Sequence, residues 1–422
     1  MIAGLRPEVI KVPEVPRASR LRWYICGLLF FATTINYIDR QVLGLLKPVI
    51  SRQLGWTEAD FGWIVSAFQT AYAIGMPLAG RLIDWVGPKR GYAIAIVIWS
   101  AAAMSHSLAR NVIQFATARF ALGIGESANF PAAIRTVADW FPQSERALAT
   151  GLFNSGTNVG ALVAPLAVPF ITTYFGWRAA FLFTGGLVIL WLILWFTGYR
   201  AAPGVTSKPQ GARTIPYSEL LRDRGAWAFL VGKFMTDPVW WFYLFWLPGF
   251  LSKNYGLNLV AMGAPLVAIY LCADVGSIAG GWLSSFLLRR GHSINFARKS
   301  AMLICGLAVT AVMLVPLTHG NMWAAVALIG LATGAHQGWS ANLFTLTSDL
   351  FPQESVGSVV GLGGLGGAIG GALVSPAVGY WLDFSHGAYG PLFVGAGAAY
   401  LIAFALIQLL VPSIGGRAAG AR

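Results

Sequence analysis

The stretch RAAFLFTGGLVILWLILWFTG, at residues 178–198, is apolar at almost every position after its first arginine. About 20 apolar residues are enough for a helix to cross a bilayer. Reading the whole chain in this way predicts twelve spans, at residues 23–46, 59–83, 91–108, 112–138, 147–174, 178–198, 226–251, 261–288, 299–317, 322–348, 356–382 and 389–411. These runs are too long for the alternating strands of a membrane barrel. The sequence therefore predicts an all-α membrane protein with twelve transmembrane helices.

The composition excludes an ordinary soluble enzyme. Of the 422 residues, 56% are hydrophobic and only 11% are charged, whereas soluble domains are about one quarter charged. An intramembrane enzyme would need a metal cluster or a nucleophile with its base. The five histidines, however, are scattered over different segments: His106, His292, His319, His336 and His386. We therefore expect no enzymatic activity, no bound metal and no cofactor.

The formal net charge of +13 follows from membrane topology. Most lysines and arginines lie in the N-terminal segment, in the C-terminal tail and in the even-numbered connections between spans. Because positive residues remain on the cytoplasmic side, we expect a multi-pass protein of the inner or plasma membrane with both termini in the cytoplasm. This distribution argues against a nucleic-acid partner. We expect a monomer in the lipid bilayer.

A long connection divides the chain into two halves. Residues 199–225 are rich in proline, glycine, serine and charge, which is typical of a linker. The sequence Asp139-Trp-Phe-Pro-Gln143 after the fourth span is repeated as Asp349-Leu-Phe-Pro-Gln353 after the tenth. We therefore expect two pseudo-symmetric six-helix halves with a transport site between them. The expected parts are a cytoplasmic N-terminal segment (1–22), an N-terminal half (23–198), a cytoplasmic linker (199–225), a C-terminal half (226–411) and a cytoplasmic tail (412–422).

A glycine-rich stretch in the eleventh span predicts helix packing. Gly361-Leu-Gly363-Gly-Leu-Gly366 fits the dinucleotide pattern G-x-G-x-x-G, but it lacks the preceding strand which that site needs. Gly363, Gly367 and Gly371 instead form a stripe of small residues that favours close contact with another helix.

The loop after the second span resembles the cytoplasmic signature of the major facilitator superfamily, G-x-x-x-D-x-x-G-x-[RK]-R. It reads Gly80-Arg81-Leu-Ile-Asp84-Trp-Val-Gly87-Pro-Lys89-Arg90. The resemblance implies the major facilitator fold and a role in conformational change for the six motif residues, Gly80, Arg81, Asp84, Gly87, Lys89 and Arg90.

Four further stretches resemble a branch of that superfamily. Asn36-Tyr37-Ile38-Asp39-Arg40 and the segment at 119–131 are similar to the anion:cation symporters. The segments at 236–248 and 335–344 are similar to their hexuronate (glucuronate or galacturonate) transporters. The resemblance implies proton-driven import of a sugar acid, with the matching Asp and Glu carrying protons and the matching Arg holding the substrate.

The charges inside the predicted spans indicate the same mechanism. Charged groups in a membrane are costly and are functional candidates by default, and Asp39, Arg40, Arg119 and Glu126 all fall in the first half. We expect Asp39 to pair with Arg119 across spans one and four, which leaves Arg40 free for a substrate carboxylate. Protonation of Asp39 and Glu126 would leave two positive charges and attract an anion. The alternative is a static salt-bridge network.

Further polar residues are candidates for substrate binding. They are Asn36, Tyr37, Thr157, Tyr243, His336, Gln337 and Asn342. The same side chains could instead tie neighbouring helices together. We expect a transporter whose partners are protons and a small organic anion. The alternatives are an obligate organic-anion exchanger and a symporter of a non-sugar carboxylate.

Overall fold

The computed structural model is entirely helical apart from its connections within the residues it describes, which are 20–141, 149–150, 152–199, 217–318, 320–351 and 353–414. Within these ranges, the side chains at 80, 81, 84, 85, 138, 348 and 353–357 are not described. The elements are α1 (Arg20–Leu54), α2 (Glu58–Val86), α3 (Pro88–Ser105), η1 (His106–Leu108), α4 (Val112–Glu126), α5 (Asn129–Trp140), α7 (Gly156–Phe175), α8 (Trp177–Gly198), α9 (Tyr217–Leu220), α10 (Arg224–Tyr255), α11 (Gly263–Arg289), α12 (Ile294–Val309), η2 (Thr310–Thr318), α13 (Met322–Leu350), α14 (Gln353–Phe384) and α15 (Gly390–Leu410).

Within the described residues the predicted spans overlap these helices, apart from differences of detail. The ninth span, for example, passes from α12 into the 3-10 helix η2 at Thr310. The fourth span is broken, because α4 ends at Glu126 and α5 begins at Asn129. The seventh span is continuous, because α10 runs through Pro238. The expected N-terminal segment, linker and tail fall largely outside the described residues.

Several helices are suited to cross a membrane. Within the described part of the chain, seven are long and apolar enough by length and composition, at Pro88–Leu108, Leu152–Phe175, Trp177–Gly198, Gly263–Arg289, Ile294–Thr318, Ser358–Phe384 and Gly390–Leu410. The long helices α1 and α10 are not among them. Both carry buried charges, which include Arg40 in α1 and Lys233 in α10.

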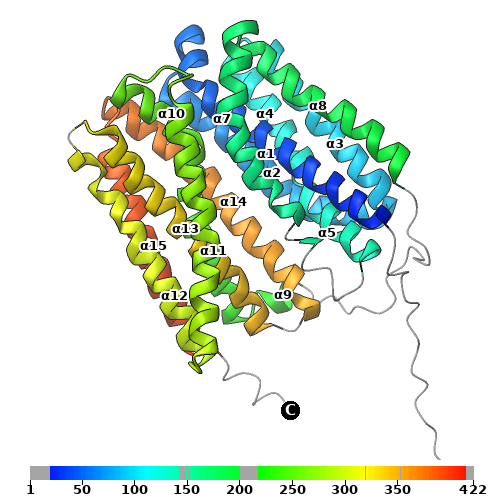
Figure 1. Cartoon of the computed structure of the whole chain (residues 1–422), viewed down its shortest axis with the longest axis vertical. Coiled ribbons are helices and arrows are strands. Elements are labelled where there is room, and N and C mark those ends of the chain that lie inside the picture. Colours follow the sequence, from blue (N-terminus) through cyan, green and yellow to red (C-terminus); the bar gives the residue numbers. More distant parts are fainter. Residues whose placement is uncertain are drawn as a thin grey trace, which may run out of the picture.

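The helices form two groups that meet along a central interface (Figure 1). In the first group α1 packs on α7 and α8, and α4 packs between α2 and α3. In the second group α10 packs on α14 and α15, and α13 packs on α11 and α12. The groups touch where α2 meets α14, where α1 meets α10 and where α7 meets α11. The residues that α1 and α10 present to each other therefore lie between the two groups.

Glycines allow the helices to approach closely at this interface. A Cβ atom at Gly62 of α2 would lie 2.6 Å from the carbonyl oxygen of Ser375 in α14. The predicted stripe on α14 is also in close contact: Gly363 faces Phe229, Gly367 faces Asp237, and Gly371 faces both Gln69 and Trp241. The expected close helix contact is confirmed.

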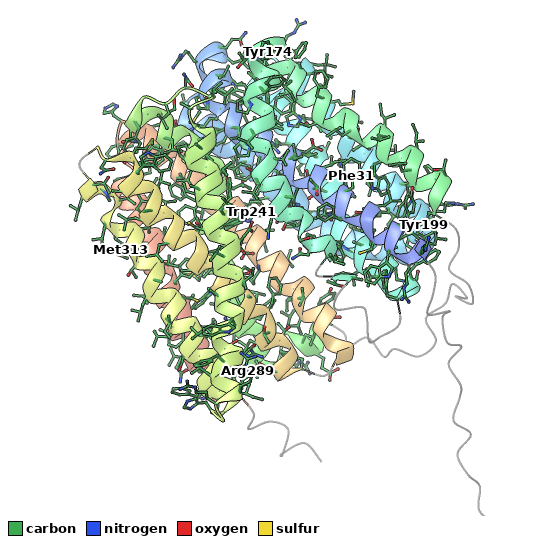
Figure 2. All side chains as sticks on the ribbon, in the orientation of Figure 1. Phe31, Tyr174, Tyr199, Trp241, Arg289 and Met313 are labelled. Carbon is green, nitrogen blue, oxygen red and sulfur yellow. The ribbon has the colours of Figure 1, made fainter. Side chains whose placement is uncertain are left out.

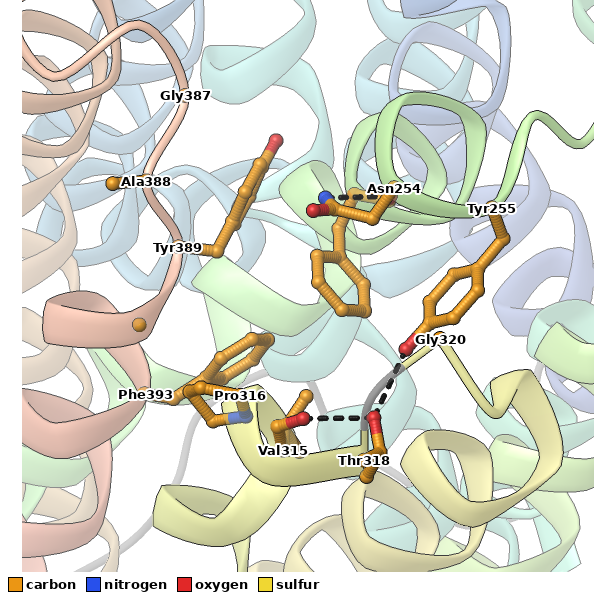
Figure 3. A pocket seen from close by; sticks show the side chains of 12 residues that line it. Asn254, Tyr255, Val315, Pro316, Thr318, Gly320, Gly387, Ala388, Tyr389 and Phe393 are labelled. Carbon is orange, nitrogen blue, oxygen red and sulfur yellow. Dashed lines mark hydrogen bonds between the residues drawn. The ribbon is translucent and has the colours of Figure 1, made fainter.

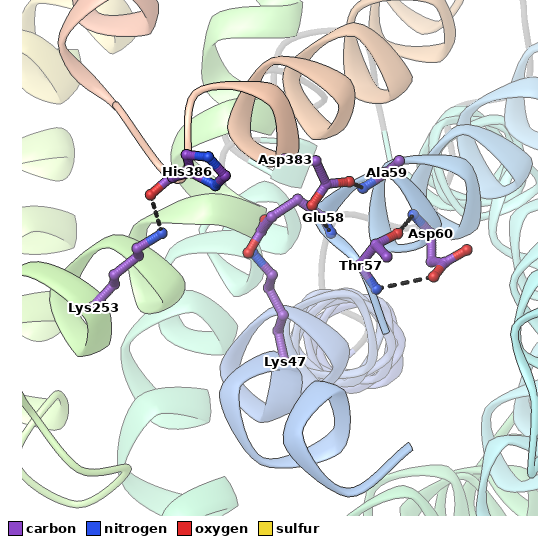
Figure 4. A network of polar contacts seen from close by, with 8 residues as sticks. All are labelled: Lys47, Thr57, Glu58, Ala59, Asp60, Lys253, Asp383 and His386. Carbon is purple, nitrogen blue, oxygen red and sulfur yellow. Dashed lines mark hydrogen bonds and ion pairs between the residues drawn. The ribbon is translucent and has the colours of Figure 1, made fainter. Parts of the chain in front are cut away.

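The end of the molecule where α1 ends and α2 begins, which we call the α1–α2 end, is held by a polar network (Figure 4). Asp383 of α14 accepts hydrogen bonds from the backbone N–H groups of Glu58 (2.8 Å) and Ala59 (2.7 Å) at the start of α2. Glu58 also pairs with Lys47 of α1. A carboxylate at a helix N-terminus is favourable because it meets free N–H groups and the positive end of the helix dipole. These contacts join the two groups of helices at this end.

The signature loop forms a one-residue turn between α2 and α3. Gly87 has φ 80°, which glycine adopts without strain, and its N–H donates to the carbonyl of Ile83. Lys89 donates to the carbonyl oxygen of Tyr199 at 2.7 Å, and Arg90 is exposed. The motif positions 80, 81 and 84 are among those whose side chains the structure does not describe.

Candidate functional site

Arg40 and Glu126 form the central ion pair of the first group of helices. The Nε atom of Arg40 donates to Oε2 of Glu126 at 2.6 Å. The two side chains are 3% and 0% exposed. Pairing offsets part of the cost of burying each charge, and the loss of either partner would leave the other charge uncompensated. Our expectation that Arg40 is free was wrong for this conformation.

The expected pair of Asp39 with Arg119 is not formed. No hydrogen bond or ion pair joins these two described side chains. Arg119 instead donates from Nη2 to the backbone carbonyl of Arg40 at 3.2 Å. Asp39 is buried and interacts with Arg119 and Glu126 electrostatically, without a direct bond to either. The physical reason is the rotation of α1. Arg40 faces Glu126 of α4, and adjacent residues on a helix point about 100° apart, so Asp39 points in another direction.

Aromatic rings surround the guanidinium group of Arg40. Its Cζ atom lies 5.2 Å from the ring centre of Tyr37, 4.8 Å from that of Tyr72 and 5.5 Å from that of Trp241. Trp241 belongs to α10, and Figure 2 shows it between the two groups of helices. Ring faces attract a cation, most strongly when water is excluded. Arg40 therefore lies where both halves contribute to its surroundings.

Two buried glutamines near this cluster were missed by the sequence analysis. Gln41 of α1 and Gln69 of α2 are 1% and 0% exposed. Among the described residues, neither side-chain amide has a hydrogen-bond partner. Gln69 lies against Gly371, as Trp241 does. Buried amides are normally hydrogen-bonded, so Gln69 is a candidate for contact with a bound molecule.

The other candidates in the first group take different places. Asn36 is fully buried one turn before Arg40, and Tyr37 is half-buried beside it. Thr157 of α7 donates to the carbonyl of Asn154 at 2.8 Å. This bond is local to its own helix segment.

His336 of α13 is held by a stacked and hydrogen-bonded group. Its ring stacks on Trp240 with centres 5.1 Å apart, and its Nδ1 atom is hydrogen-bonded to the hydroxyl of Tyr400. Tyr400 in turn donates to the carbonyl of Thr236 at 3.4 Å. This chain joins α13 to α15 and α10.

The remaining candidates of the second group differ in their hydrogen bonding and burial. Tyr243 is fully buried, and its hydroxyl has no partner among the described residues. Asn342 donates from Nδ2 to the carbonyls of Gly280 and Gly338, both at 2.9 Å, so it ties α13 to α11, in agreement with the packing alternative. Gln337 is half-buried on α13.

Comparison with known proteins identifies the family. Residues 29–375 match the model of the Major Facilitator Superfamily. The chain belongs to this superfamily.

Two curated relatives are transporters of sugar acids. The chain is 30% identical to the hexuronate transporter of Escherichia coli (strain K12), over 93% of each chain. It is also 30% identical to the D-galactonate transporter of Escherichia coli O6:H1 (strain CFT073), over 94% of this chain and 97% of the relative. The protein is therefore a multi-pass membrane transporter related to sugar-acid transporters, and not an enzyme.

A solved structure shares the fold. The bacterial homologue of the human lysosomal transporter Spinster, in its inward-facing and occupied conformation, matches with a TM-score of 0.73 at 20% identity. The match covers 93% of this chain and 96% of that one. The expected major facilitator fold is confirmed.

The transporter also has a cavity of about 320 Å³ near the α1–α2 end of its second group of helices (Figure 3). Aromatic rings line it, including Phe250, Tyr255 and Tyr389, and Tyr255 shares a hydrogen bond with Thr318. Its lining contains none of the residues around Arg40. The charged cluster remains the candidate for transport.

Proposed function

We propose that this transporter imports a hexuronate or a related sugar acid by proton symport and alternating access. The observation that carries this proposal is the buried ion pair of Arg40 and Glu126 beside Trp241, at the interface of the two halves. The relation to sugar-acid transporters supports the class of substrate.

Proton binding at Glu126 would free Arg40 for the substrate. A protonated Glu126 no longer balances the charge of the guanidinium group, which is costly to bury alone. A substrate carboxylate can take the place of Glu126, because a guanidinium group binds a carboxylate through two parallel hydrogen bonds. Proton uptake and anion binding therefore favour each other.

Asp39 is the second proposed proton site. Its carboxylate interacts electrostatically with Arg119, and Arg119 holds the backbone carbonyl of Arg40. A change of charge at Asp39 would act on Arg119 and, through it, on the segment that carries Arg40. Arg119 is thus a positioning residue in this mechanism.

The rest of the substrate would lie between the two halves, against polar side chains from α1, α10 and α13. The proposed lining residues are Asn36, Tyr37, Tyr243, His336 and Gln337. Gln69 of α2 adds an unpartnered buried amide that suits a sugar hydroxyl. Thr157 and Asn342 already bond within the protein, which makes them weaker candidates.

We further propose the orientation that follows from the positive charges. Both termini would be cytoplasmic, and the α1–α2 end would face outward. The contacts of Asp383 with α2 would then close the outer side. The halves at 23–198 and 226–411 would rock about the central cluster, and the signature loop after α2 would act in this change on the cytoplasmic side.

Uptake into proteoliposomes under an imposed pH gradient tests the proposal. We expect accumulation of labelled galacturonate or glucuronate that requires an inward proton gradient. Glu126→Gln and Asp39→Asn should abolish accumulation while exchange of internal for external substrate persists. Gradient-driven accumulation in both variants would overturn proton coupling, and wild-type exchange without net uptake would favour an obligate exchanger.

A further inference from the structure

Lys233 and Asp237 form a second charge pair, which the proposed mechanism does not use. Nζ of Lys233 lies 2.8 Å from Oδ2 of Asp237, one turn along α10. The side chains are 11% and 17% exposed. Lys233 also lies over the ring of Phe344 in α13, 4.6 Å from its centre. The pair is thus largely buried but less enclosed than Arg40 and Glu126.

The pair lies on the same side of α10 as Trp241, whose ring contacts Arg40. Lys233, Asp237 and Trp241 are four residues apart in turn, which places them on one side of the helix. The Trp241 ring lies 5.5 Å from the guanidinium carbon of Arg40, and Lys233 lies about 12 Å along the helix axis from Trp241. The hydroxyl of Tyr37 lies near both Arg40 and Asp237. Arg40 of the N-terminal half and Lys233 of the C-terminal half therefore lie near opposite ends of the α10 segment that runs from Trp241 to Lys233.

A packing role explains this pair poorly. Arg40 and Glu126 join two helices by a salt bridge, whereas the salt bridge of Lys233 and Asp237 lies within α10. Lys233 reaches α13 only through its contact with the ring of Phe344. Buried charges in a membrane protein are expensive. A pair of neutral residues would hold α10 equally well, so the charges themselves need a reason.

We propose that Lys233 binds a second anionic group of the substrate. When no substrate is bound, the ammonium group of Lys233 is paired with Asp237. This inference rests on the proposed function and ranks its substrates: a sugar acid with a carboxylate at each end would bind more tightly than a monoacid such as galacturonate. One carboxylate would bind Arg40 from the N-terminal half, and the other would bind Lys233 from the C-terminal half. Binding would then link the two halves through the substrate itself.

Binding of a sugar diacid and of a sugar monoacid to the purified full-length protein tests this inference. The probes are galactarate and galacturonate, and the readout is the ratio of their dissociation constants from tryptophan fluorescence or calorimetry. We expect the wild-type protein to bind galactarate about tenfold or more tightly, as charged hydrogen bonds allow. Lys233→Gln should remove this preference and leave the affinity for galacturonate unchanged.

Two further variants control for folding and for nonspecific charge effects. Lys233→Gln leaves Asp237 without its cation, so Lys233→Gln combined with Asp237→Asn provides a neutral pair that should fold and also lack the preference. Lys299→Gln removes a lysine that donates to the carbonyls of Val411 and Pro412, and it should keep the preference.

The outcomes separate the two proposals. An unchanged preference in both Lys233 variants, or equal binding of the two acids by the wild type, would overturn the role of Lys233 alone. If the wild-type protein binds neither acid, the proposed sugar-acid substrate fails together with this inference.

Discussion

In the N-terminal half the central charges are paired between helices, whereas in the C-terminal half they are paired within one helix. Arg40 of α1 reaches Glu126 of α4, and Lys233 and Asp237 share α10. The nearby polar group of the C-terminal half, around His336, is instead stacked and hydrogen-bonded. A pair between helices is sensitive to their relative position. The N-terminal half is therefore suited to link protonation to helix movement. In the C-terminal half the charge pair does not depend on how two helices lie relative to each other.

The largest expected effect is on stability after loss of one buried partner. Glu126→Ala should lower the free energy of unfolding by about 3–5 kcal/mol, because it leaves a buried guanidinium group without its carboxylate. Asp237→Ala should cost less, since Lys233 is more exposed. Thermal unfolding in detergent, followed for both variants, measures the difference. Equal losses would contradict the contrast drawn between the halves.

The contact between the halves should respond to a single methyl group. Gly62→Ala places a Cβ against the backbone of Ser375, and overpacking of this kind costs about 1–3 kcal/mol. We expect the α1–α2 end to open. Spin labels at Arg52 and Phe384, at the ends of α1 and α14, would report a longer distance. Gly281→Ala is the matched control, because a Cβ there meets no atom within 4 Å, and a similar lengthening in that control would remove the explanation.

Removal of the Asp383 charge should also open the α1–α2 end, by less than Gly62→Ala does. Asp383→Asn removes the negative charge at the start of α2, and such a charge is worth about 0.3–1 kcal/mol. The same spin-label distance should show a modest shift towards the open state. Addition of Gly62→Ala should extend that shift, and a shortened distance in Asp383→Asn would count against a closing role.

An effect of similar size is expected in the C-terminal half. Tyr400→Phe removes the hydrogen bond to His336 and should cost about 1 kcal/mol of stability. Proton-driven uptake should be weakened but retained, because the proposed coupling groups lie in the other half. Complete loss of coupling in Tyr400→Phe would show that the polar group around His336 does more than support α10 and α13.

The sequence predicted the helices well because bilayer thickness imposes long apolar runs. It did not predict the break between Glu126 and Asn129, where Ser127 and Ala128 form a turn. The charge pair in α10 could have been predicted from the sequence, since Lys233 and Asp237 have the four-residue spacing at which helical side chains meet.

Local residue order established the class of the protein, its helices and the residues that carry charge into the membrane. The partners of those charges depended on tertiary structure. Asp39 and Arg40 are adjacent in the chain, and either could have faced α4. The rotation of α1 about its axis and the closeness of α2 and α4, where Gly123 packs on Phe68 and Ala71, place Arg40 beside Glu126. Such rotations arise from packing summed over the whole bundle, which no single stretch of sequence contains.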